Sequence, residues 1–135
     1  MKNEEGIKIK VRYNETDSMQ YLYHGNYVYY YHASRTELLR KIGLSDKELE
    51  TNGIILPVIE LQSKFLKPAF YDDELVVKTK LSEISACKLF FLHNIYNTQN
   101  ELINQGNTTV AYVNESTRKP VKIPTQIAKR LRFLI

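Results

Sequence analysis

The sequence predicts an α+β domain in which an antiparallel sheet of about five strands wraps around one long helix. Three observations favour this class. Apolar and polar side chains alternate over residues 7–13, apolar residues recur with helical spacing over residues 26–42, and four further strand-like segments joined by short turns follow from residue 55. Strands joined by short turns pair antiparallel, and such a sheet can fold around a single helix.

The first half of the chain supplies one strand, a polar loop and the long helix. The strand is expected to end at Tyr13, and residues 14–23 form the loop. One helical face carries Tyr27, Tyr30, Tyr31, Ser34, Leu38 and Ile42. Charged residues are expected to point away from that face, namely Arg35, Glu37, Arg40 and Lys41. Gly43 is a suitable helix stop.

The second half supplies a short helix, four strands and a last helix. Ser45 and Glu48 have capping-box spacing, which predicts a helix over residues 46–51. Strands are expected at residues 55–66, 74–84, 87–98 and 102–114. Pro57 restricts pairing near the start of the first of these. A short amphipathic helix capped by Thr125 is expected over residues 125–134.

Length and composition fit one globular domain over residues 1–135. Hydrophobic residues make up 43% and charged residues 25%, which argues against disorder. The net charge of +4 is dispersed along the chain, and no nucleic-acid-binding motif accompanies it. Nucleic acid is therefore not predicted as a partner.

The distribution of cysteine and apolar residues predicts a soluble, cytoplasmic protein. Cys87 is the only cysteine, so no intramolecular disulfide can form. Residues 1–13 contain no apolar leader segment, and no apolar run approaches the ~18–20 residues of a membrane span. Stable membrane insertion is therefore not expected.

Asp17 lies in the polar loop shortly before the long helix, and two roles fit that position. Taken alone, it is more typical of a turn or capping aspartate that satisfies nearby backbone donors. The alternative is a catalytic carboxylate beside a helix N-terminus. Unpaired N–H groups and the positive end of the helix dipole there can stabilise an oxyanion during acyl transfer.

His24 and Tyr13 flank the same loop. A lone histidine at a helix start is more often a structural hydrogen-bonding residue than a catalyst. Tyr13 fits packing better than chemistry, although its hydroxyl can orient a carboxylate. The three histidines are dispersed and no phosphate-binding glycine motif occurs, so neither a metal nor a bound cofactor is predicted.

Several different short motifs are spread along the chain. They are Val11–Tyr13, Glu15–Asp17, Met19, His24, Asn26–Tyr27, Arg35, Glu37, Leu39–Arg40, Pro57–Glu60, Phe65–Ala69, Tyr71–Leu75 and Gly106–Pro124. Together they resemble the hotdog-fold acyl-CoA thioesterases of the hydroxybenzoyl-CoA thioesterase family. The nearest branch is that of small bacterial enzymes, including the one encoded with the Tol-Pal system. The resemblance covers nearly the whole chain.

The resemblance implies a site at the start of the helix. Asp17 matches the catalytic carboxylate of the family, and the backbone N–H of His24 matches an oxyanion-hole donor, with Gly25 beside it. The His24 side chain matches a histidine common in this branch, which implies that it also assists catalysis through hydrogen bonding. Tyr13 matches a motif tyrosine, and Glu37 a helix acid with a structural or supporting role. In this family two subunits pair their sheets edge to edge. A homodimer is therefore expected, further assembling to a tetramer, with active sites at the dimer interface.

Two residues depart from the family pattern. Gln20 stands where glycine is usual, so the loop is expected to differ in shape because glycine tolerates conformations that other residues resist. His32 stands where glutamate is usual, which removes an acid near the acyl pocket. Substrate range is therefore less transferable than the reaction.

The predicted reaction is hydrolysis of a fatty or small acyl-CoA to free acid and CoA. Asp17 either attacks the thioester or activates a water, while the N–H groups of His24 and Gly25 bind the carbonyl oxygen. CoA is then part of the substrate, and Lys88 and Arg118 are candidate contacts for its phosphates.

Three other functions remain open. One is a non-catalytic acyl-CoA-binding hotdog protein, which the two departures from the family pattern keep in play. Another is an enoyl-CoA hydratase on the same fold that uses an Asp/His pair. A nucleic-acid-binding module is the weakest of the three, because only the positive charge supports it.

Overall fold

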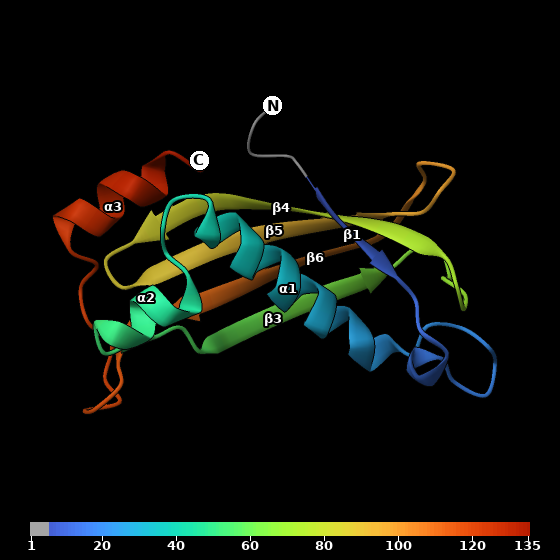
Figure 1. Ribbon diagram of the computed structural model, residues 1–135, viewed down its shortest axis with the longest axis horizontal. Helices are drawn as coiled ribbons and strands as arrows, with labels where there is room; N and C mark the ends of the chain where they lie inside the picture. Colours follow the sequence, from blue (N-terminus) through green and yellow to red (C-terminus); the bar gives the residue numbers. More distant parts are fainter. Residues whose placement is uncertain (1–5) are drawn as a thin grey trace.

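The computed structural model describes residues 6–135; residues 1–5, which belong to the predicted domain, lie outside this range. Its main sheet has five strands in the order β1-β4-β5-β6-β3, and every neighbouring pair is antiparallel (Figure 1). The strands are β1 (Gly6–Lys10), β3 (Val58–Phe65), β4 (Glu74–Ser85), β5 (Lys88–Tyr96) and β6 (Leu102–Ala111). The predicted α+β class, a five-stranded sheet around one long helix, is confirmed.

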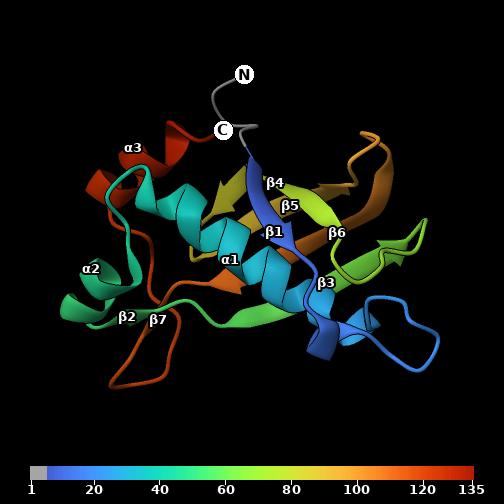
Figure 2. The same ribbon diagram turned by 45° about the vertical axis from the view of Figure 1, so that its right-hand side comes forward.

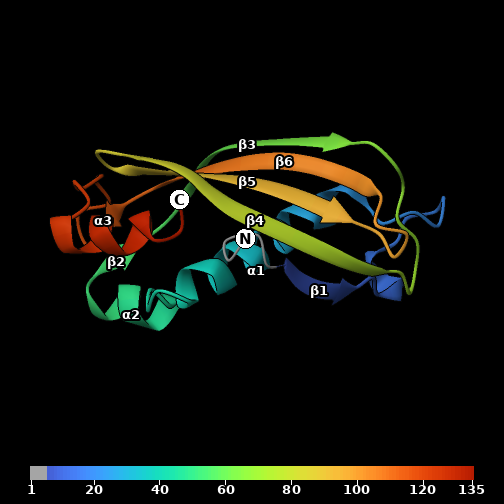
Figure 3. The same ribbon diagram turned by 90° about the horizontal axis from the view of Figure 1, so that it is seen from above.

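Helix α1 (Tyr27–Arg40) crosses one face of the sheet. Helix α2 (Asp46–Thr51) lies on the same side, and the twisted sheet curves over both (Figure 3). Helix α3 (Thr125–Arg132) lies at the end of the sheet far from the start of α1. Among residues 6–135, no helix is long and apolar enough to cross a membrane.

Two predicted strands are each divided into two. The segment predicted at residues 55–66 forms β2 (Ile54–Ile55) and β3, because Pro57 between them has no N–H to donate. The segment predicted at residues 102–114 forms β6 and β7 (Val113–Asn114), which have different partners: β6 pairs with β3 and β5, and β7 pairs with β2. Strands β2 and β7 pair as a separate small sheet (Figure 2).

Element ends were predicted less well than element types. The first strand ends at Lys10, so placing Tyr13 at its end was wrong; Tyr13 begins a short 3-10 turn, Tyr13–Glu15. Thr125 does not cap the last helix, since Pro124 precedes it in extended conformation and Thr125 is already helical. The Ser45 cap is confirmed, because its side chain accepts a hydrogen bond from the Glu48 N–H.

Two apolar clusters fill the space between α1 and the sheet. One surrounds the first half of α1 and includes Tyr27, Tyr30, Leu75, Ile95 and Ile103. The other surrounds its second half and joins α2 and α3 to the sheet through Leu38, Leu49, Phe91, Val110 and Leu131. The site described below lies at the end of the first cluster.

A polar belt of five buried side chains separates these clusters: Ser34, Arg35, Thr79, His93 and Thr108. Arg35 is only 6% exposed, so the prediction that it points away from the packed helix face was wrong. Its Nη1 donates to the Thr108 hydroxyl over 3.2 Å, and its Nη2 lies 3.0 Å from Nδ1 of His32. These contacts provide partners for the buried guanidinium group of Arg35, which forms no ion pair with any of residues 6–135.

The belt forms one hydrogen-bonded chain across the core. His93 Nε2 and Nδ1 each lie 2.8 Å from a hydroxyl, those of Thr108 and Thr79 respectively, and Thr79 donates to Ser34 over 2.6 Å. The hydrogen bonds can all point the same way, with Arg35 donating to Thr108, Thr108 to His93, His93 to Thr79 and Thr79 to Ser34. Each proton along this chain then has an acceptor. Burial, and then the charge of Arg35, lower the pKa of His93 to about 3, so its ring is neutral.

Candidate active site

Residues 14–23, here called the Asp17 loop, are pinned at both ends. Thr16 and Leu22 form an antiparallel bridge across it, and Tyr21 forms another with Phe70 just before β4. The Leu22 N–H also donates to the Ala69 carbonyl over 2.7 Å. The loop, blue in Figure 2, therefore has a defined path beside the N-terminal end of α1.

Asp17 organises its own turn with one carboxylate oxygen. Its Oδ1 accepts the N–H of Met19 at 2.9 Å and that of Tyr21 at 3.2 Å, and its backbone N–H donates to the Tyr21 carbonyl. No donor from residues 6–135 contacts Oδ2. The turn role inferred from sequence therefore leaves one oxygen for chemistry.

Gln20 adopts the backbone conformation that glycine would favour. Its φ is +68°, in the left-handed region, and its N–H donates to the Asp17 carbonyl over 2.9 Å. Gln20 thus accepts a strained conformation in this turn instead of avoiding it.

The N-terminal end of α1 supplies unpaired donors. A 3-10 turn, His24–Asn26, leads into the helix, and the Asn26 N–H donates to the Tyr23 carbonyl. Within the described chain, neither the His24 N–H nor the Gly25 N–H has an acceptor. Two such groups at the positive end of the helix dipole suit a developing oxyanion.

Asp17 and His24 line one open pocket of about 340 Å³. Its walls are mainly apolar and aromatic, and the other lining residues are Tyr21, Leu22, Tyr27, Phe65, Leu66, Lys67 and Pro68. The His24 ring is exposed and packs against the Tyr23 ring at 4.3 Å between centroids. The fold therefore brings Asp17 and His24, two residues of the predicted site, into the same pocket.

The other predicted residues lie outside this pocket. Tyr13 is 76% exposed, and its ring contacts the edge of the Tyr71 ring at 5.6 Å. Lys88 begins β5 opposite Ser85, at the far end of β4, a strand on the order of 40 Å long. Arg118 follows β7 at the same far end. Within one chain, neither cation reaches Asp17.

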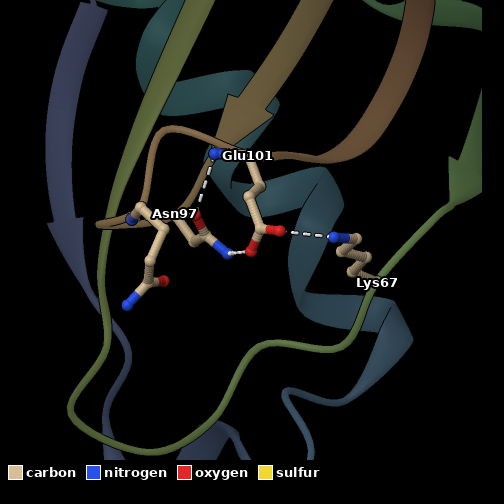
Figure 4. Close-up of polar contacts among 4 residues, drawn as sticks. Lys67, Asn97 and Glu101 are labelled. Carbon is tan, nitrogen blue, oxygen red and sulfur yellow. Dashed lines mark hydrogen bonds and ion pairs between the residues drawn. The ribbon is translucent and has the colours of Figure 1, made fainter.

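Lys67 lines the pocket but was not assigned a site role from the sequence. Its ammonium pairs with the Glu101 carboxylate, which also accepts a hydrogen bond from Asn97 over 2.8 Å (Figure 4). Lys67, followed by Asn97, lowers the pKa of the Glu101 carboxyl. The motif Phe65–Ala69 contains Lys67, but only the fold identifies it as a pocket residue.

Glu37 and His32 on α1 each contact a neighbour on the same helix. Glu37 lies 3.4 Å from Arg40 one turn along the exposed face, which is a supporting role. His32 contacts Arg35 as described above. Within residues 6–135, no three His, Cys, Asp or Glu side chains gather as metal ligands would.

A long helix wrapped by an antiparallel sheet is the architecture of the hotdog fold. The chain belongs to the thioesterase-like superfamily, whose family model matches residues 11–131. The hotdog fold and the family predicted from sequence are thereby confirmed.

Relatives with known names agree with this membership. The acyl-CoA thioester hydrolase YbgC of Escherichia coli is 29% identical over 124 residues, 92% of each chain. The chloroplastic acyl-acyl carrier protein thioesterase ATL3 of Arabidopsis thaliana is 32% identical over 129 residues, 95% of this chain and 68% of its own.

Solved structures agree as well. The DHNA-CoA thioesterase of Staphylococcus aureus is 34% identical with a TM-score of 0.84, covering 87% of this chain and 79% of its own. The hypothetical protein TT1821 of Thermus thermophilus is 32% identical with a TM-score of 0.91, covering 98% and 100%. The narrower resemblance to the Tol-Pal-associated branch stays a prediction.

Proposed function

We propose that this protein is an acyl-CoA thioesterase that hydrolyses a fatty or small acyl-CoA to the free acid and CoA. The observation that carries the proposal is a mainly apolar-walled pocket lined by both Asp17 and His24, at the end of α1 where the N–H groups of His24 and Gly25 have no acceptor within residues 6–135. Family membership and the names of the relatives support the same reaction class. The single cysteine favours a reducing, cytoplasmic location for this one-domain enzyme.

In the proposed mechanism, the thioester carbonyl oxygen accepts hydrogen bonds from the N–H groups of His24 and Gly25. The free oxygen of Asp17 attacks the carbonyl carbon, CoA leaves as the thiolate, and water then hydrolyses the mixed anhydride. Alternatively, Asp17 removes a proton from a water that attacks the same carbon. Both routes yield the same acid and thiol, and both require Asp17 ionised.

We further propose a homodimer formed through β3. This strand is the edge of the main sheet, and its exposed side chains include Val58, Ile59, Leu61 and Phe65. An exposed apolar edge strand presents unpaired backbone groups to a second strand. Antiparallel pairing of two β3 strands would continue the sheet and cover these side chains, and two such dimers would form a tetramer.

This pairing would give Lys88 and Arg118, which lie far from Asp17 in one chain, a position near the pocket of the second copy. The Asp17 pocket adjoins the C-terminal end of β3, through Phe65 and Leu66, whereas Arg118 and Lys88 lie toward the N-terminal end of the same strand. In an antiparallel β3 pair, the N-terminal end of one copy lies beside the C-terminal end of the other. The second copy could therefore bring these cations toward the phosphates of the bound CoA.

A panel of acyl-CoA esters assayed with a thiol-detecting reagent tests the reaction. We expect thiol release from at least one ester, with the preferred acyl group defining the substrate. Consumption of an enoyl-CoA without thiol would indicate a hydratase instead. Binding of acyl-CoA without any turnover would indicate a non-catalytic binding protein, and either result would overturn the proposal.

A further inference from the structure

Glu15 accepts four hydrogen bonds at the junction of the Asp17 loop and α1. Its Oε1 accepts the Arg12 N–H and the Tyr30 hydroxyl, each at 2.9 Å. Its backbone carbonyl accepts the Tyr23 N–H at 2.8 Å and the Asn26 side-chain amide at 2.9 Å. Arg12 precedes the loop, Tyr23 ends it, and Asn26 and Tyr30 follow it, so Glu15 lies at the centre of a small network.

The backbone carbonyl of Glu15 fixes the donor side of the site. Its two partners, Tyr23 and Asn26, flank the His24–Gly25 pair in the sequence. Asn26 precedes α1 yet its side chain makes no capping bond to the helix. Its side-chain amide donates to the Glu15 carbonyl instead, and this bond holds the His24–Asn26 turn, with its two unpaired N–H groups, next to Glu15.

The side chain of Glu15 joins the loop that carries Asp17 to helix α1. Tyr30 is 3% exposed on α1, and its hydroxyl reaches from the packed core to the loop. Burial, and then the hydrogen bond to Glu15, raise the pKa of Tyr30, which keeps it protonated as a donor. Only Thr16, itself bridged to Leu22, separates Glu15 from Asp17.

We propose that Glu15 is a positioning residue, which sets the placement of the Asp17 carboxylate relative to the His24 and Gly25 N–H groups through its bonds to Tyr30 and Asn26. The inference rests on the proposed thioesterase function. Attack on a carbonyl requires the nucleophile and the oxyanion donors to be placed to within a fraction of an ångström, and a misplacement of about 1 Å can cost 100-fold in rate. Glu15 lies two residues before Asp17 in the loop and accepts hydrogen bonds from Asn26, beside the donor pair, and from Tyr30 of α1.

The test compares kcat and KM for the best acyl-CoA substrate in the full-length protein. Tyr30→Phe deletes one hydroxyl, and Glu15→Ala deletes both side-chain bonds. We expect kcat to fall about 10- to 100-fold with KM nearly unchanged. Glu15→Gln keeps an acceptor oxygen and should restore most of the rate. The double variant Glu15→Ala/Tyr30→Phe should be no slower than Glu15→Ala, because both changes remove the same bond.

Controls separate positioning from folding and from the reaction itself. Tyr29→Phe alters an exposed tyrosine next to Tyr30 and should leave kcat and Tm unchanged. If kcat stays at the wild-type value in Glu15→Ala and Tyr30→Phe, or falls only in proportion to lost folded protein, Glu15 has no positioning role. Glu15→Gln as slow as Glu15→Ala would also overturn it. A wild-type protein that releases no thiol would instead overturn the thioesterase function and this role with it. A fully active Asp17→Asn variant would leave the thioesterase function standing and overturn the catalytic role of Asp17, and with it the positioning role of Glu15.

Discussion

The polar belt and the Asp17 loop are both rich in polar groups, yet they differ in how those groups are satisfied. In the belt, each proton along the chain from Arg35 to Ser34 has an acceptor, and the side chains are nearly inaccessible. In the loop and the 3-10 turn that follows it, the second oxygen of Asp17 and the N–H groups of His24 and Gly25 have no partner among the described residues.

The satisfied groups of the belt suit a role in stability, and the unsatisfied groups of the site suit a role in binding and reaction. A closed network in a core resists any change because each lost partner leaves a buried group unsatisfied. An open set of donors and one free carboxylate oxygen can bind a substrate without first breaking internal bonds. Substitutions in the belt should therefore change stability, and substitution of the Asp17 carboxylate should change rate.

The largest stability effect is expected from Thr108→Val. Valine has the same shape but leaves Arg35 Nη1 and His93 Nε2 without the Thr108 hydroxyl. We expect a loss of about 2–4 kcal/mol in the free energy of unfolding. Thr109→Val is the matched control, because the neighbouring Thr109 hydroxyl makes no hydrogen bond within residues 6–135. Equal losses in the two variants, measured by urea denaturation, would contradict the closed-network account.

The second effect is a dependence of stability on pH that comes from His93. Its native pKa of about 3 lies below the unfolded value of 6.5, so below pH 6.5 the unfolded state binds the extra proton. His93 therefore makes the free energy of unfolding fall by about 1.4 kcal/mol per pH unit as the pH drops from 6 to 4. The slope should become shallower by that amount in His93→Gln; an unchanged slope would show that the ring is not held neutral.

A smaller effect of opposite sign is expected in the loop from Gln20→Gly. Glycine adopts a φ of +68° without steric cost, so the variant should be about 1 kcal/mol more stable than wild type. Met19→Gly is the control, since residue 19 has no positive φ to relieve and the change should destabilise. Thermal unfolding of both variants would detect the difference. A destabilising Gln20→Gly would mean that the turn is not strained at this residue.

Periodicity predicted the elements of this fold because their apolar positions follow the period of a strand or a helix. The belt could not be predicted in this way. Its residues are scattered from Ser34 to Thr108, and polar side chains on a helix or strand are normally exposed, which is why Arg35 was assigned to the surface. A buried role for such residues depends on tertiary partners that no local pattern contains.

The site was predictable only in part for the same reason. Local pattern identified Asp17 as a turn residue, which its Oδ1 bonds confirm, and the catalytic role came only from resemblance. Glu15 was noted only within the family motif, because its significance lies in contacts with Tyr30 and Asn26, 15 and 11 residues away. Lys67 similarly became a pocket residue only through the folding of β3 beside the loop.

The most direct test of the contrast between loop and belt is Asp17→Asn, measured for both rate and stability. Asparagine keeps an Oδ1 that can accept from Met19 and Tyr21, so the turn and the free energy of unfolding should be preserved to within about 1 kcal/mol. Loss of the charge should lower kcat for acyl-CoA hydrolysis by about 10²- to 10⁴-fold. A folded Asp17→Asn protein that hydrolyses acyl-CoA at the wild-type rate would contradict the account.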